Sequence, residues 1–200
     1  MNKFSYGNAS TEGVYYDEEN RRHLNTLRSA HAQLALSLFD AGKKDSARNI
    51  LEHFDKNVLE SNFPYGMTSS RNQHDRVSSS FLLACYQTGD LALAKKVAAS
   101  MKRDLSQQMR YYHSLGTEHM NDEQLAMNAQ MFKQGKGGNL TERQSQFIDD
   151  ILSCYEMQVH MEDWEKRWGS GHPLLTEDGP SLDTNQQPPT AGDSGPPKAK

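Results

Sequence analysis

The chain has few of the features that mark membrane-spanning, secreted or nucleic-acid-binding proteins. Its 200 residues contain no apolar run of about 18 or more, the length that a membrane-spanning helix needs. The first residues, "MNKFSYGNAS", lack the apolar stretch of a signal peptide. A formal net charge of -4 gives no general attraction for phosphate backbones. We therefore expect no nucleic-acid partner and no direct membrane insertion by this chain.

Motifs for metal binding and nucleophilic catalysis are also missing. The eight histidines form no HxxxH, HExxH or His/Cys spacing, and no GxSxG motif is present. Cys85 and Cys154 lie in separate apolar patterns without a CxxC spacing, which is typical of small buried hydrophobic residues. The glycine-rich stretch at 134–139 lacks the spaced first glycine and the Ser or Thr of a phosphate loop. We expect no cofactor, no metal site and no catalytic residue.

Hydrophobic periodicity is helical, and strand-type alternation is absent, so the fold class is all-α. Asp17 is a good N-cap, and an apolar stripe follows it to the turn at Gly42. That stripe consists of Leu24, Leu27, His31, Leu34 and Leu38. Later helices are expected from Asp45, before "QTGD", from Asp90 to Gly116, through Leu125, Met127 and Met131, and from Thr141 to Trp164 or Trp168. The pattern predicts about six helices.

The composition divides the chain into three parts. Residues 1–16 form a lead-in, and residues 17–168 carry the helical patterns. Residues 169–200 are rich in Pro, Gly, Asp and Gln, and they have too few large apolar residues to offset the entropy of ordering. We expect this last part to be a disordered tail.

Two predicted helical hairpins share one register. The same 47 positions separate Gly42 from Gly89 and Ala47 from Ala94. A glycine at the turn and an alanine five residues later resemble the tetratricopeptide pattern, although the offset exceeds the usual repeat of about 34 residues. We interpret the hairpins as a degenerate tetratricopeptide-like repeat of antiparallel helices. The alternative is an ordinary antiparallel bundle with two similar turns.

A repeat of this kind presents one face of its first helices as a shallow groove. The register predicts a candidate groove that suits docking of a peptide or protein domain, or packing by another helix of the same polypeptide. Its predicted positions are Ser29, Ala32, Leu36, Phe39 and Asp40 in the first hairpin, and Arg76, Ser79, Leu83, Tyr86 and Gln87 in the second.

Residues from about Phe4 to Gly116 resemble the soluble C-terminal region of a family of large bacterial membrane proteins that are similar to protein O-mannosyltransferases. Two stretches carry the resemblance. The first is the run of Val14, Tyr15, Asp17, Glu18, Arg21 and Arg22, and the second is the turn of Asp40, Gly42, Lys43, Lys44 and Asp45. The resemblance implies a tetratricopeptide-like region whose transferase site lies in a membrane portion that is absent from this chain.

These observations favour a non-catalytic helical domain that docks a protein, a peptide or the membrane portion of its own polypeptide. The resemblance implies association with the inner membrane, with the domain on the periplasmic side. The alternatives are a stand-alone tetratricopeptide-like adaptor, which would be cytoplasmic, a small α-helical enzyme whose acids and histidines come from distant positions, and a purely structural domain.

Overall fold

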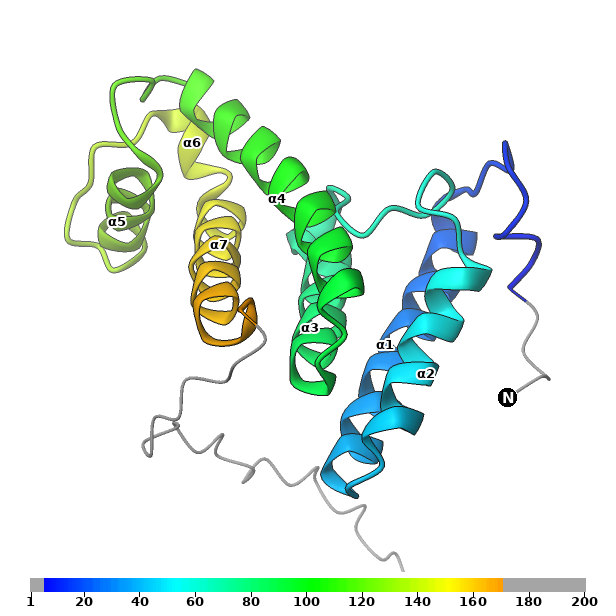
Figure 1. Ribbon diagram of the computed structural model, residues 1–200. Helices are drawn as coiled ribbons and strands as arrows, with labels where there is room; N and C mark the ends of the chain where they lie inside the picture. The colour runs from blue at the N-terminus through cyan, green and yellow to red at the C-terminus, as the bar shows by residue number, and fades with distance from the viewer. Residues whose placement is uncertain (1–5, 171–200) are drawn as a thin grey trace, which may run out of the picture.

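The computed structural model describes residues 6–170, and every regular element in that range is helical (Figure 1). The all-α prediction is therefore confirmed. The helices are α1 (Glu18–Asp40), α2 (Lys44–Asn57), the 3-10 turn η1 (Ser70–Asn72), α3 (Gln73–Thr88), α4 (Leu91–Ser114), α5 (Asp122–Lys133), α6 (Glu142–Ser145) and α7 (Ile148–Trp168).

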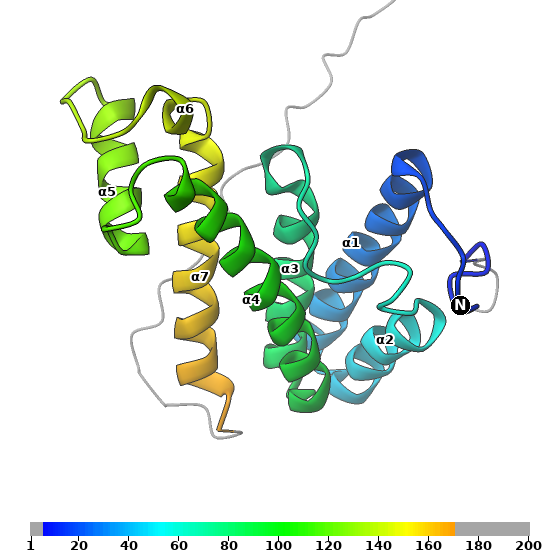
Figure 2. The ribbon, with the colours of Figure 1, turned by 90° about the horizontal axis from the view of Figure 1, so that it is seen from above.

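Two antiparallel hairpins, α1–α2 and α3–α4, lie side by side, and the later helices extend the row. α1 packs against α2 and α3, α3 packs against α4 and α7, and α5 packs against α7. The turns of both hairpins lie at the lower end of the molecule in Figure 1, where α7 also ends. Seen from above, α7 lies on the opposite side of α3 from α1 (Figure 2).

Local signals in the sequence set both hairpins. The Asp17 carboxylate accepts the Asn20 amide hydrogen at 2.9 Å, and Asp90 accepts that of Leu93 at 3.1 Å, so both predicted caps are confirmed. Gly42 and Gly89 each have a φ of 75°, the left-handed conformation that ends α1 and α3 without a Cβ penalty.

The prediction that Asp45 caps the second helix is wrong by two residues. Lys43 is the N-cap of α2, and Asp45 lies within its first turn. Because left-handed Gly42 already reverses the chain, helical geometry begins at once after Lys43. Asp45 remains favourable there, since the positive end of the helix dipole attracts an acid.

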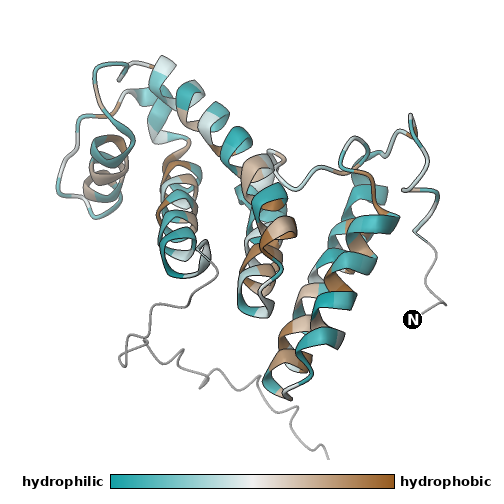
Figure 3. Ribbon diagram, viewed as in Figure 1, coloured by the Kyte–Doolittle hydropathy of each residue, from teal (hydrophilic) through white to brown (hydrophobic). Residues whose placement is uncertain are grey.

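The core lies between the two hairpins and continues toward α7. Ala47 and Ala94, which the repeat pattern singled out, are both 0% exposed. Their small side chains let neighbouring helices approach closely. In Figure 3 the outward side of α2 is hydrophilic, as expected of a helix with one buried stripe. The largest fully buried apolar side chains include Phe54, Phe63, Phe81, Leu82, Met101, Leu105, Met109 and Ile151.

The described part of the lead-in, residues 6–16, belongs to this core. The Ala9 carbonyl accepts hydrogen bonds from Leu59 N at 2.9 Å and from Asn62 Nδ2 at 3.0 Å. Tyr16 is buried, whereas Tyr15 is 81% exposed, so only one of the two tyrosines fastens the lead-in to the domain. Of the predicted tail, residues 171–200 lie outside the described residues.

The last predicted helix is interrupted, which is one reason why the described residues contain seven α-helices rather than about six. Thr141 caps the four-residue α6, and the helix breaks at Gln146 and Phe147 before α7 begins. The fully buried Gln144 donates to the Tyr112 carbonyl at 2.9 Å. Phe147 packs against Tyr112, with ring centroids 5.5 Å apart. Both contacts hold the chain against the end of α4, so it must bend before it continues.

The buried side of α5 also differs from the sequence pattern. Met127 and Met131, predicted on its apolar stripe, are 56% and 38% exposed. The buried side consists of Leu125, Ala126 and Ala129. α5 packs on α7 through this side, where two alanines allow a close approach.

Gly66 marks a close approach between the 58–69 segment and α4, and it carries a stability prediction. A β-carbon at this position would lie 2.4 Å from the Ser100 carbonyl oxygen and 2.8 Å from Met101 Cα, both backbone atoms of α4. We expect Gly66→Ala to lower the free energy of unfolding by about 2 kcal/mol in urea unfolding, because the segment must move away from the helix.

Gly42→Ala is the control for this substitution. Gly42 has no atom near a built β-carbon, so its replacement incurs only the left-handed strain, about 1 kcal/mol. A loss at Gly66 no larger than the loss at Gly42 would contradict the packing argument.

Candidate functional site

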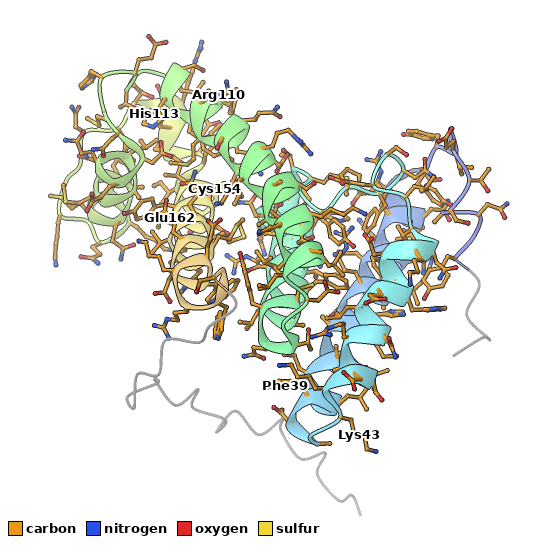
Figure 4. All side chains as sticks on the ribbon, in the orientation of Figure 1. Phe39, Lys43, Arg110, His113, Cys154 and Glu162 are labelled. Carbon is orange, nitrogen blue, oxygen red and sulfur yellow. The ribbon has the colours of Figure 1, made fainter. Side chains whose placement is uncertain are left out.

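A pocket of about 500 Å³ lies at the end of the molecule where both hairpins turn and α7 stops. We call it the turn-end pocket. In Figure 4 the label Phe39 marks the lower end of α1 and the label Lys43 marks the start of α2, both at this end of the molecule. The pocket is lined by Phe39, Lys44, Arg48, Tyr86, Gln87, Gly89, Leu91 and Trp168.

Three aromatic rings from three helices form the apolar part of the pocket. The rings of Tyr86 and Trp168 stack, with centroids 6.2 Å apart and planes 26° from parallel. Tyr86 is only 4% exposed, and burial, with the Glu165 carboxylate nearby, raises the pKa of its hydroxyl. Phe39 contributes the third ring, from the last turn of α1. The half-buried rings of Phe39 and Trp168 offer an apolar surface to a side chain from outside, and the Tyr86 ring supports Trp168 from beneath.

Two cations form the polar part of the pocket. A β-carbon built at Gly89 would lie 3.5 Å from both Lys44 Nζ and Arg48 Nη2, so the two cations lie together over this turn. Arg48 Nη2 donates to the Thr88 carbonyl at 3.1 Å, and its buried Nε has no partner within residues 6–170. Neither cation forms an ion pair with any described residue. The pocket therefore combines an apolar wall with unneutralised positive charge.

The structure brings some of the predicted groove residues together and separates others. Phe39, Tyr86 and Gln87 meet in the turn-end pocket. Arg76 lines a second concavity at the other end of α3. The remaining positions line no pocket among those found: Ser29, Leu36, Ser79 and Leu83 are half-buried, Asp40 is exposed, and Ala32 is fully buried in the core.

α7 contacts α3 at both ends of the predicted groove. Arg76 Nη2 donates to Ser153 Oγ of α7 at 3.0 Å, and Tyr86 stacks on Trp168. An open groove along the whole of α3 is therefore not observed. A helix of the same polypeptide occupies part of it, which was one of the two alternatives for this face.

The residues that carry the family resemblance have local structural roles. Asp17 caps α1, and Glu18 pairs with Arg22 at 3.8 Å. Arg21 lies over the exposed Tyr15 ring, 5.7 Å from its centroid, and Val14 packs on the core. In the second stretch Asp40 ends α1, Gly42 turns the chain, Lys43 and Asp45 begin α2, and Lys44 lines the turn-end pocket.

The buried Asp75 and the half-buried Asp104 form the strongest candidate for acid–base chemistry. Asp75 is 0% exposed and lies beside Asp104. Burial first, and Asp104 second, raise the pKa of Asp75 to about 8. Neither acid lines the turn-end pocket. Gln108, whose amide donates to Asp75 at 3.4 Å and to Asp104 at 2.7 Å, lines a separate concavity beside α4.

Three important pocket residues were missed by sequence reasoning: Arg48, Trp168, and Lys44, which was named only for the family resemblance. Arg48 follows Lys44 by one helical turn, and this spacing was a usable signal because residues four apart share a helix face. Trp168 comes from the far end of the described chain, and no local pattern links it to Tyr86. Only the packing of α7 on α3 makes that connection.

Comparison with known proteins identified no relative. No protein family, no curated protein and no solved structure matched this chain. Within the described range, no helix is both long and apolar enough to cross a membrane. Across residues 6–170, no three His, Cys, Asp or Glu side chains are grouped in a way that could hold a metal ion.

Proposed function

We propose that this chain is a non-catalytic helical docking domain that binds a polypeptide segment at the turn-end pocket. The segment carries an aliphatic side chain next to one or two acids. The aliphatic side chain packs on the rings of Phe39, Tyr86 and Trp168, and the acids meet Lys44 and Arg48. The observation that carries the proposal is the coexistence of an apolar wall and two unpaired cations in one pocket of about 500 Å³.

The parent protein is part of the same proposal. The domain is the soluble, tetratricopeptide-like C-terminal part of a membrane glycosyltransferase-like protein, on the periplasmic side of the inner membrane. There it holds a polypeptide acceptor near the transferase portion. The support for this parent is the resemblance of residues 4–116, and the support for docking is the chemistry of the pocket.

A fluorescence titration tests the docking step. Trp164→Phe leaves Trp168 as the single tryptophan, at the pocket wall. The probe is an acetylated, amidated Leu-Leu-Thr-Glu-Asp peptide, which copies residues 174–178. The receiving chain carries Leu174→Ser and Leu175→Ser, so that its own copy does not compete. We expect a saturable change in Trp168 emission, and at least about tenfold weaker binding after Lys44→Glu with Arg48→Glu.

The matched control places the same charge change elsewhere. Arg110→Glu with Lys136→Glu alters two exposed cations that do not line the pocket, and the affinity should stay within about twofold. Changing Phe39 and Tyr86 to alanine should also weaken the peptide complex. If the peptide leaves Trp168 emission unchanged, or if the control variant loses as much affinity as the pocket variant, the proposed function fails.

A further inference from the structure

A second concavity, at the opposite end of α3 from the turn-end pocket, gathers three arginines. Its volume is about 600 Å³, and its lining residues are Arg22, Ser70, Arg71, Gln73 and Arg76. We call it the arginine concavity. Arg22 comes from the first turns of α1, and the other two arginines come from η1 and α3. Two parts of the chain that are far apart in sequence thus direct guanidinium groups to one place.

The acids around the arginine concavity leave much of its charge unpaired. Arg22 approaches Glu18 at 3.8 Å and Glu19 at 3.6 Å, both long contacts between exposed side chains. Burial and the neighbouring Asp149 raise the pKa of Asp150, and the positive charges of Arg71 and Arg76 offset only part of that rise. Neither arginine forms an ion pair with Asp150.

The remaining acid and hydroxyl near the concavity have other partners. Asp149 is held by Lys133 at 2.7 Å. Arg76 gives one hydrogen bond to the Ser153 hydroxyl, which is uncharged. No acid lines the concavity itself.

The backbone at Arg71 is held in an unfavourable conformation that keeps this arginine at the concavity. Arg71 and Asn72 have φ values of 54° and 52°, two consecutive non-glycine residues in the left-handed region. Asn72 is 1% exposed and is anchored to α7, since its amide donates to the Asp150 carbonyl and to Cys154 Sγ, each at 3.3 Å. Such strain lasts only where the surrounding structure enforces it, and it clusters at functional sites.

From these observations we infer that the arginine concavity binds a phosphate group, carried by a small solute or by a lipid headgroup. A planar guanidinium can donate two parallel hydrogen bonds to the oxygens of a phosphate. Three guanidinium groups from two segments line this concavity, so they can neutralise the negative charge of a bound phosphate. Ser70 and Gln73 add a hydroxyl and an amide as neutral donors. α3 also begins at Gln73, so the positive end of its dipole faces the same space. This site is independent of the turn-end pocket and goes beyond the proposed docking function.

Isothermal titration of the full chain with inorganic phosphate, at constant ionic strength, is the first arm of the test. The second arm measures sedimentation with vesicles that contain phosphatidic acid, against vesicles of phosphatidylcholine alone. We expect saturable binding in at least one arm. Binding of phosphate alone assigns the site to a small solute, and binding of phosphatidic acid vesicles alone assigns it to a headgroup.

The variants separate binding from folding. Arg71→Gly removes the guanidinium and also relieves the left-handed strain, so it should weaken phosphate binding at least about fivefold while the melting temperature stays the same or rises. Arg76→Gln should weaken binding similarly, and Arg71→Lys should restore part of it. Arg110→Gln, an exposed arginine on α4 outside the concavity, is the control. Absence of binding in both arms, or an equal loss in the Arg110 variant, overturns the inference.

Discussion

Arg28→Ala is expected to lower the free energy of unfolding by about 4 kcal/mol, the largest effect of any single substitution proposed for this protein. Arg28 is 0% exposed. Its guanidinium donates to Ser78 Oγ at 2.7 Å, to the Phe63 carbonyl at 3.1 Å and to the Pro64 carbonyl at 3.0 Å. It thereby joins α1, the 58–69 segment and α3.

Aromatic rings complete the surroundings of Arg28. Its guanidinium carbon lies 4.1 Å from the Phe63 ring centroid and 4.6 Å from that of Tyr65. Burial lowers the pKa of Arg28 to about 10, so the side chain stays charged at neutral pH. Alanine would leave a cavity among these rings and would leave the buried carbonyls without their donor.

Chemical denaturation measures the fall in the free energy of unfolding caused by Arg28→Ala. Two further variants help to assign its cause. Arg22→Ala, in the same helix but with its side chain 68% exposed, should change stability by no more than about 0.5 kcal/mol. Arg28→Met restores volume without donors, so it should recover only part of the loss. A methionine variant as stable as wild type would show that the hydrogen bonds of Arg28 add nothing to stability.

Asp75→Asn is expected to stabilise the protein by about 2 to 4 kcal/mol at pH 8, and to leave it nearly unchanged at pH 4. Asp75 accepts hydrogen bonds from Met67 N at 3.3 Å and Gln108 Nε2 at 3.4 Å, yet burial and the nearby Asp104 raise its pKa to about 8. Asparagine has a similar shape and is neutral at every pH. It therefore avoids the cost of a buried carboxylate beside Asp104.

The sign follows from proton binding. An unfolded Asp75 releases its proton near its ordinary pKa of 3.8, whereas the folded protein keeps it until about 8. The folded state therefore binds more protons between these values, so the contribution of Asp75 to stability falls as pH rises from about 4 to about 8 and then levels off. Burial lowers the pKa of His31 and His74, which act in the opposite direction below about 6.5.

Urea unfolding of wild type and variant at several pH values tests this prediction. The quantity compared is the difference between their free energies of unfolding at each pH. The difference removes the histidine contributions, which both proteins share. Asp149→Asn is the control: the Lys133 ammonium lowers the pKa of this exposed acid, so its substitution should give no gain at pH 8. If Asp75→Asn destabilises the protein at pH 8 as much as at pH 4, the buried carboxyl is ionised and the argument is wrong.

The sequence predicted the hairpins because their signals are local. Caps at Asp17 and Asp90 and left-handed glycines at 42 and 89 act within a few residues, and helical periodicity marks one face of each helix. The break before α7 was not predictable in this way. It depends on Gln144 and Phe147 reaching the end of α4, about thirty residues earlier in the chain.

The candidate sites were harder to predict for a related reason. Phe39, Tyr86 and Gln87 could be placed near one another from the shared register, but Trp168 and the left-handed Arg71 depend on how α7 packs. Arg28 lies on the same helical stripe as Leu24 and His31, so its spacing was a usable signal of burial that the sequence prediction did not use. Because charged residues are usually exposed, Arg28 was not assigned to the buried stripe.

The two free thiols, which burial keeps protonated, also allow local unfolding to be measured through the rate at which each thiol reacts with a labelling reagent. Burial raises the pKa of Cys85 and Cys154, so a thiol reagent attacks either sulfur only after local or global unfolding. Cys85 lies in the second hairpin, whereas Cys154 lies in α7 and donates to Gln108 at 3.3 Å. Their separate labelling rates therefore compare the opening of the hairpins with the release of α7. Equal labelling rates would indicate that the hairpins and α7 unfold as one cooperative unit, and different rates would indicate two. The experiment needs no engineered cysteine.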